Sequence, residues 1–169
     1  MPRSLADGHE KIAILTTKPA NPAIPTVTEL AAGLDVACNI LESDWSFGPT
    51  DSATFAERAV CEENDVNAYG PGSGQFGATI FRNWAVDGDP DALLDAAFSA
   101  VKVKGSTIWV YSRKTPKKST EAWEADDEIR YGAEVLTDTP QDMRGGYIKY
   151  RCPGQVQKSW PFTKAGAGS

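Results

Sequence analysis

Runs of β-branched and aromatic residues, each bounded by glycine, proline or charged loops, constrain the fold of this chain most strongly. Residues 106–113 form the clearest run, with isoleucine, tryptophan, valine and tyrosine in succession. In residues 129–136 an apolar side chain stands at every second position from Ile129 to Val135. Such residues favour the pleated surface of a sheet, and a period of two is that of a strand. Both segments are therefore predicted to be β-strands.

Weaker patterns predict further strands. They lie at residues 11–17, 35–41, 54–62, 75–84 and 147–152. Residues 75–84 carry apolar groups on both faces, which favours a central position in a sheet. Pro19, Pro22 and Pro25 follow the first run, and they remove the backbone donors that a continuing strand would need. The chain is thus predicted to contain about seven strands.

One substantial helix is predicted at residues 90–104. Asp89 can cap it, and Pro90 occupies the favoured first helical position. Leu94, Phe98 and Val101 form one apolar stripe, which must be buried against a neighbouring element. Residues 26–29 fit a capping box, and a glycine follows at position 33, so a helix of one or two turns is predicted between them.

These elements predict a mainly β fold with one flanking α-helix, arranged as a β-sandwich or partial barrel. The length of 169 residues suggests a single domain. Residues 11–156 would form this β domain. Residues 1–10 are predicted to be an N-terminal arm, and residues 157–169 a C-terminal arm or tail.

The charge balance argues against a protein that grips nucleic acid. The formal net charge is −6 and the pI is about 4.8. A protein that binds DNA through its phosphates needs clustered lysine and arginine. A surface past which DNA slides is compatible with the acidic balance.

Cysteine usage and hydropathy indicate a chain made in a reducing compartment. Three cysteines, Cys38, Cys61 and Cys152, are too widely spaced for a C-x-x-C motif and are odd in number. Cys38 is predicted to be a small core residue. The first residues contain no apolar stretch typical of a signal peptide, and no run approaches membrane-spanning length. We expect a cytoplasmic site of synthesis.

The residue patterns offer little catalytic chemistry. The single histidine, His9, stands in the polar N-terminal arm. A general base must be held in a fixed position, and an unanchored arm does not provide one. Residues 72–77 match G-x-G-x-x-G, but a strand is predicted after them instead of the helix that binds pyrophosphate. Acidic clusters at residues 62–65 and 121–128 lack calcium-loop spacing, and runs of charge are usually solvated. We therefore expect no enzymatic activity.

Several segments in order resemble a known family. They are residues 11–22, 36–41, 104–114, 127–140 and 146–151. Together they resemble the major tail proteins, or tail tube proteins, of long-tailed phages that infect actinobacteria. The likeness covers most of residues 11–156 and depends on the shared order of the segments. It implies a β-sandwich with a flanking helix that completes a larger barrel when subunits assemble into a ring.

The resemblance also implies a function and a set of partners. Subunits would form hexameric rings that stack into a hollow tube, surround the tape measure protein during assembly, and later conduct the genome. Tail-end and terminator proteins would close the tube, and double-stranded DNA would pass through without specific binding. No cofactor, metal or catalytic residue is implied, and no membrane is involved. The site of action would be the virion tail, assembled in the host cytoplasm, with no contractile sheath expected.

Acidic residues on strand-like runs are candidates for the lumen of such a tube. A basic lumen would hold DNA, whose duplex carries about one negative charge per 1.7 Å of axis, whereas an acidic one would let it slide. Glu57, Glu62 and Glu134 are predicted lumen residues on this ground.

Two other segments are candidates for contacts between subunits. One is the long charged loop of residues 114–127, in which basic residues come first and acidic ones follow. It could dock head to tail or remain a solvated loop. Its candidates are Lys114, Lys117, Lys118, Glu121, Glu124 and Asp126. Trp160 and Phe162 could belong to an arm that becomes ordered on a neighbour.

Two alternative functions fit the same fold. One is a tail-end or baseplate component, which would stop at a single ring instead of forming a filament. The other is a carboxylate-based hydrolase using Glu62, Glu63 and Asp65, which would require a concave pocket around them.

Overall fold

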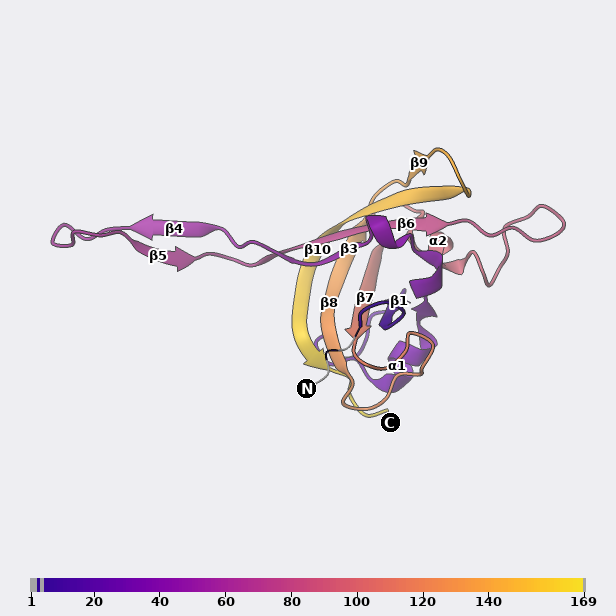
Figure 1. Cartoon of the computed structure of the whole chain (residues 1–169), viewed down its shortest axis with the longest axis horizontal. Coiled ribbons are helices and arrows are strands. Elements are labelled where there is room, and N and C mark those ends of the chain that lie inside the picture. Colours follow the sequence, from indigo (N-terminus) through magenta and orange to yellow (C-terminus); the bar gives the residue numbers. More distant parts are fainter. Residues whose placement is uncertain (1–2, 4, 169) are drawn as a thin grey trace.

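The computed structural model describes residue 3 and residues 5–168, and it contains one large antiparallel sheet (Figure 1). The strand order is β2-β1-β7-β8-β10-β6-β3, with β9 paired to β10. These strands are β1 (Glu10–Leu15), β2 (Leu34–Asp35), β3 (Ser46–Thr50), β6 (Ser73–Phe81), β7 (Thr107–Lys114), β8 (Glu128–Thr137), β9 (Gln141–Met143) and β10 (Lys149–Lys164). A separate two-stranded sheet joins β4 (Thr54–Glu57) to β5 (Val66–Tyr69).

The long strand β10 joins the two halves of the large sheet. Its first part pairs with β6, from Lys149 opposite Phe81 to Gly154 opposite Phe76. Its second part pairs with β8, from Gly154 to Lys164, with a register shift between Val156 and Lys158. A bulge of this kind bends a strand and increases its twist. The sheet consequently curves strongly through β10 and β8, as Figure 1 shows.

Two hydrophobic clusters cover opposite faces of the sheet. Ile12 and Ile14 of β1 belong to the larger cluster, whereas Ala13 and Leu15 belong to the smaller one. Successive side chains of a strand point to opposite faces, so the clusters lie on either side. Helix α2 (Ala96–Val101) packs into the larger cluster, and Leu30 of helix α1 (Val27–Ala32) packs into the smaller one.

The mainly β architecture is confirmed, and within the described residues the sheet does not close into a barrel. Residues 106–113 and 129–136 form β7 and β8 to within one residue at either end. The capping box is also confirmed, since the backbone N–H of Glu29 donates to the Thr26 hydroxyl and that of Thr26 donates to the Glu29 carboxylate. The described residues form two short α-helices, one at each of the two places where a helix is predicted.

The predicted helix at residues 90–104 is shortened to residues 96–101, and the cap at Asp89 was wrong. Asp91 accepts hydrogen bonds at its Oδ1 from the backbone N–H groups of Leu93 and Leu94, at 2.9 and 2.8 Å. This side-chain turn competes with a helix at the same residues. Of the predicted stripe, Phe98 and Val101 are buried, whereas Leu94 is exposed.

Two predicted strand boundaries also differ from the structure. Residues 35–41 contain only the end of β2, followed by a 3-10 turn at Ala37–Asn39. The predicted C-terminal arm from residue 157 instead continues β10 as far as Lys164, because β8 supplies a partner for it. The predicted N-terminal arm, residues 1–10, lies partly outside the described residues, as does Ser169 of the predicted tail.

Candidate assembly surfaces

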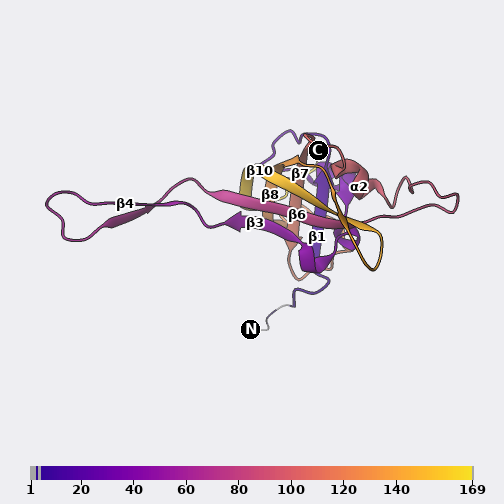
Figure 2. The ribbon, with the colours of Figure 1, turned by 90° about the horizontal axis from the view of Figure 1, so that it is seen from above.

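A long hairpin, residues 51–72, projects far beyond the body of the protein (Figures 1 and 2). It leaves the sheet after β3 and returns to it at β6. Four residue pairs join β4 to β5, from Thr54 opposite Tyr69 to Glu57 opposite Val66. All residues of both strands are exposed. The sequence pattern predicted a single strand over residues 54–62, whereas the strand ends at Glu57 and the chain turns back through residues 58–65.

The hairpin presents apolar side chains to solvent. Phe55, Val60, Val66 and Tyr69 are all more than half exposed. An isolated two-stranded hairpin is at best marginally stable in water, and it needs a third strand or a packed face. Exposed apolar surface on such an element marks an interaction site. The hairpin is therefore the strongest candidate for a contact with another protein surface.

Two of the predicted lumen residues lie on this hairpin. Glu57 is the last residue of β4, and Glu62 lies in the turn at its tip, next to Glu63 and near Asp65. Arg58 is the one basic residue of the hairpin, and its Nε lies 3.9 Å from Asp65 Oδ1. The tip is thus strongly acidic.

The third predicted lumen residue, Glu134, lies on β8 in the body, so the structure does not bring the three together. It stands directly opposite Trp109 of β7 and Lys158 of β10. It is partly exposed on the sheet face that carries the smaller hydrophobic cluster. Nearby Tyr111 is fully buried, and burial, followed by the charges of Glu29 and Glu134, raises the pKa of its hydroxyl.

A free backbone edge runs along the second half of β10. Residues 155–164 pair with β8 on one side, and on the other side no strand of the described chain joins them. Phe162 is 72% exposed there, with φ at +52°, whereas Trp160 is half-buried against the smaller cluster. An unpaired edge is a template for pairing with another chain, although Lys158 and Pro161 limit indiscriminate pairing. Of the two predicted contact residues, only Phe162 points outward.

The charged loop between β7 and β8 is fixed by a buried arginine. Arg113 is completely buried, and its Nη1 donates to Asp127 Oδ2 and to the carbonyl of Ala122, both at 2.9 Å. Its Nη2 donates to the carbonyls of Lys118 and Glu121, at 3.0 and 3.1 Å. Its guanidinium carbon lies 5.2 Å from the centre of the Trp123 ring. This one side chain holds the loop in a defined conformation.

Three charged side chains of this loop, Lys117, Glu124 and Asp127, are paired with one another. Lys117 Nζ lies 2.6 Å from both Glu124 Oε2 and Asp127 Oδ1. The hydrogen bonds that Lys117 donates to Asp127 and Glu124 raise its pKa. Burial alone would raise the pKa of Asp127, but hydrogen bonds from Lys117, the Glu124 backbone and Arg113 lower it below its usual value.

The other charged candidates of the loop are placed differently. Lys114, Lys118, Glu121 and Asp126 remain exposed, and Glu121 Oε1 accepts a hydrogen bond from the backbone N–H of Lys118 at 3.1 Å. The contact role of the loop stays a prediction.

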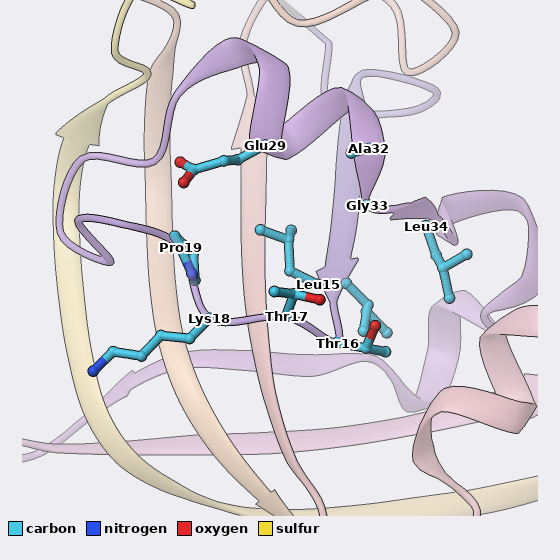
Figure 3. Close-up of a pocket in the computed structure, with 10 residues that line it drawn as sticks. Leu15, Thr16, Thr17, Lys18, Pro19, Glu29, Ala32, Gly33 and Leu34 are labelled. Atoms are coloured by element: carbon cyan, nitrogen blue, oxygen red, sulfur yellow. The ribbon is translucent and has the colours of Figure 1, made fainter.

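An open cleft lies between the end of β1, the proline-rich segment and α1 (Figure 3). Leu15, Pro19 and Ala32 contribute apolar walls, and Glu29 contributes a carboxylate. That carboxylate accepts from the backbone N–H groups of Ala20 and Thr26, both at 2.8 Å, and these bonds lower its pKa. Glu29 therefore fastens the proline-rich segment to the start of α1.

The cysteines occupy three different environments. Cys61 lies exposed at the hairpin tip, and Cys152 is buried in the larger cluster. Burial raises the pKa of Cys152 to about 12. Cys38 is exposed, so its predicted place in the core was wrong, because residues 37–39 form a 3-10 turn instead of a strand.

In the described part of the chain, no helix is long and apolar enough to cross a membrane.

A free sheet edge and an exposed apolar hairpin are features typical of proteins that associate through β surfaces. Comparison with sequence families identifies which kind: the profile described as phage tail tube protein matches residues 1–168. The chain belongs to the phage tail tube protein family and is a structural component of the virion tail. Comparisons with curated proteins and with solved structures gave no significant match. The family inferred from the sequence is confirmed, whereas the actinobacterial host stays a prediction.

Proposed function

We propose that this protein assembles into hexameric rings that stack into a tube, through which the genome leaves the virion. The observation that carries the proposal is the hairpin of residues 51–72, which exposes apolar side chains and has no packed face in the lone subunit. A surface of a second copy would supply that face. Membership of the tail tube family supports the tube as the assembled form.

The free edge of β10 supports contacts within a ring. Residues 155–164 could accept a strand from the neighbouring subunit, which would extend the sheet around the ring. Head-to-tail contacts of this kind close into a ring when the rotation between subunits permits. The number six is the expectation from the family resemblance.

The acidic balance supports a bore that does not retain DNA. Each subunit carries a formal charge of −6, and repetition around a ring multiplies this field. We propose that Glu134, on the body of the protein, faces the bore. The tape measure protein, the terminator and the tail-end proteins are the other partners that the proposal names, and it assigns no enzymatic reaction to the chain.

Electron microscopy of the purified protein at increasing concentration tests the proposal. Long hollow tubes of uniform diameter are expected, and single rings would instead favour a tail-end component. A variant in which a two-residue turn replaces residues 51–72 should keep the circular dichroism spectrum of a folded β protein but remain monomeric. Wild-type protein that stays monomeric at every concentration, and is absent from virus particles, would overturn the proposal.

A further inference from the structure

The hairpin tip carries two properties that its partner surface must match. It is acidic, through Glu57, Glu62, Glu63 and Asp65, and it exposes Val60 fully. A partner should therefore offer both basic and apolar or aromatic side chains, because complementary potentials select one surface over another. This inference rests on the proposed self-assembly and asks which surface of the next copy receives the hairpin.

Two segments lie on the side of the body that faces away from the hairpin (Figures 1 and 2). One is the loop of residues 82–95 between β6 and α2, and the other is the turn of residues 144–148 between β9 and β10. β6 itself connects the two ends, since the hairpin precedes it and the loop follows it. A head-to-tail contact along the long axis would bring the hairpin to one of these segments.

The loop of residues 82–95 has the wrong charge for this contact. Val86 and Leu93 are highly exposed and would suit the apolar part of the hairpin. Asp87, Asp89 and Asp91, however, give it the same sign of charge as the tip. Its basic residue, Arg82, is already paired with Asp95 at 2.9 Å. Like charges brought together across an interface oppose binding.

The β9–β10 turn has the matching composition. Tyr147 is 82% exposed and Ile148 is 56% exposed, so the turn offers an aromatic and an aliphatic surface. The Tyr147 ring stands edge-on to Phe81, with 6.2 Å between ring centres, which supports its position. Arg144 is exposed, and within the described residues it forms no ion pair.

The shape of the turn is also defined. Gly145 and Gly146 both have positive φ, +88° and +67°, a conformation that favours glycine. Lys149 Nζ donates to the carbonyl of Gly145 at 2.6 Å and closes the turn. The turn thus presents Arg144, Tyr147 and Ile148 on a fixed backbone.

We propose that the acidic hairpin tip of one copy docks on the basic, aromatic β9–β10 turn of the next copy along the tube. Both partners are present on every subunit, so the contact is heterologous and repeats without closing, which generates a filament. The negative charge of the loop of residues 82–95 repels the acidic hairpin tip, so the hairpin does not dock on that loop.

A charge exchange tests this pairing. Arg144→Glu and the pair Glu62→Lys with Glu63→Lys should each raise the protein concentration needed for tube formation by about tenfold or more. Combining the two changes should restore assembly towards the wild-type concentration. The matched control places Asp87→Lys and Asp89→Lys in the protein with the wild-type tip and Arg144, and the concentration needed for tube formation should stay unchanged. A lower concentration in that control would show that the acidic tip docks on the loop of residues 82–95. That outcome, or no rescue by Arg144→Glu, would overturn the pairing.

Cross-linking gives an independent readout that uses the native Cys61. In a Cys38→Ser background, Tyr147→Cys should yield a ladder of covalent oligomers after mild oxidation of tubes, because a disulfide requires close approach of the two β-carbons. Leu93→Cys in the same background should give no ladder. Tubes that cross-link through position 93, or not through position 147, would contradict this inference and leave the proposed function standing. Failure of wild-type protein to form tubes would contradict both.

Discussion

Arg113 and Asp127 form a buried ion pair, with Nη1 of the arginine 2.9 Å from Oδ2 of the carboxylate and both side chains almost inaccessible to solvent. The pair connects the end of β7 with the residue before β8. Five further groups share it, because the arginine also donates to three carbonyls and the carboxylate also accepts from Lys117 and from the backbone N–H of Glu124. The loop between the strands is therefore held by one buried network.

Replacing Arg113 with methionine should lower the free energy of unfolding by about 3–5 kcal/mol, because it removes the buried positive partner of Asp127 and leaves three carbonyls without their donor. Urea denaturation followed by tryptophan fluorescence measures the change. Lys104→Met is the control. Its pair with Asp138 spans 3.8 Å and is exposed, so its loss should cost less than about 1 kcal/mol. Equal effects of the two changes would contradict the network.

The stability contributed by Asp127 should depend on pH in one direction. The pKa of Asp127 is lower in the folded protein than in the unfolded chain. Its contribution to stability is therefore fully present at pH values above the pKa of the unfolded chain, and it disappears as the pH falls through the pKa of the folded protein. At pH 7, Asp127→Asn should destabilise the protein by about 1.5–3 kcal/mol. The difference from wild type should shrink below about pH 4. A difference that is constant from pH 7 to pH 3 would be inconsistent with this ion pair.

Gly132 allows the buried Tyr111 ring to lie against the backbone of β8. A β-carbon at position 132 would stand 2.6 Å from Tyr111 Cδ1, and Tyr111 is held by a 2.7 Å hydrogen bond from its hydroxyl to the carbonyl of Pro22. Gly132→Ala should therefore lower the thermal midpoint, at a cost of about 1–3 kcal/mol. Gly72→Ala, where the nearest atom is 3.9 Å away, should change stability by less than about 0.5 kcal/mol.

The three thiols should react at different rates. Cys38 and Cys61 are exposed, whereas Cys152 is buried with a pKa raised to about 12, so it forms little thiolate at pH 8. A chromogenic disulfide reagent should titrate two thiols rapidly in the folded monomer and the third only after denaturant is added. Cys38→Ser should leave one fast thiol, and three fast thiols in the wild type would contradict the buried position of Cys152.

Glu134→Lys tests the proposed lining of the bore. The residue is on the sheet and away from the hairpin and from the β9–β10 turn, so tubes should form normally. A positive charge there should slow genome release, because it attracts the phosphate backbone. Release from virions carrying Glu134→Gln should be intermediate between wild type and Glu134→Lys. Equal release rates for all three would remove Glu134 from the bore.

Replacing Glu62 distinguishes its predicted role in the lumen from its proposed role in docking, because the two roles predict opposite effects on tube assembly. As a lumen residue, its replacement with lysine would leave tubes intact. As a docking residue at the hairpin tip, its replacement together with Glu63 should impair assembly. The concentration at which tubes appear decides between them.

The strands β7 and β8 were predictable because each carries its own pattern: residues 106–113 and 129–136 show strand composition without reference to any partner. The second half of β10 was not, since its bulge between Val156 and Lys158 breaks the alternation and Pro161 resembles a strand breaker. Its partner β8 supplies the pairing, and no local pattern reveals a partner. The hairpin is harder to predict, because residues 54–62 have the composition of one continuous strand. The acidic residues 62–65 form a polar cluster between two apolar runs, which also indicates a turn.

The continuity of β10 has a consequence for the speed of folding. Its pairing with β6 joins residues about seventy positions apart, such as Arg151 and Thr79, and the pairing of β1 with β7 joins Glu10 to Lys114. Closing such long loops costs conformational entropy before the stabilising strand contacts can form. Topologies rich in β structure of this kind therefore fold in milliseconds to seconds. Until β10 is in place, the β6–β3 pair and the β8–β7–β1 group remain separate and expose their edges. The nascent subunit therefore passes through an interval in which premature sheet pairing competes with completion of its own fold.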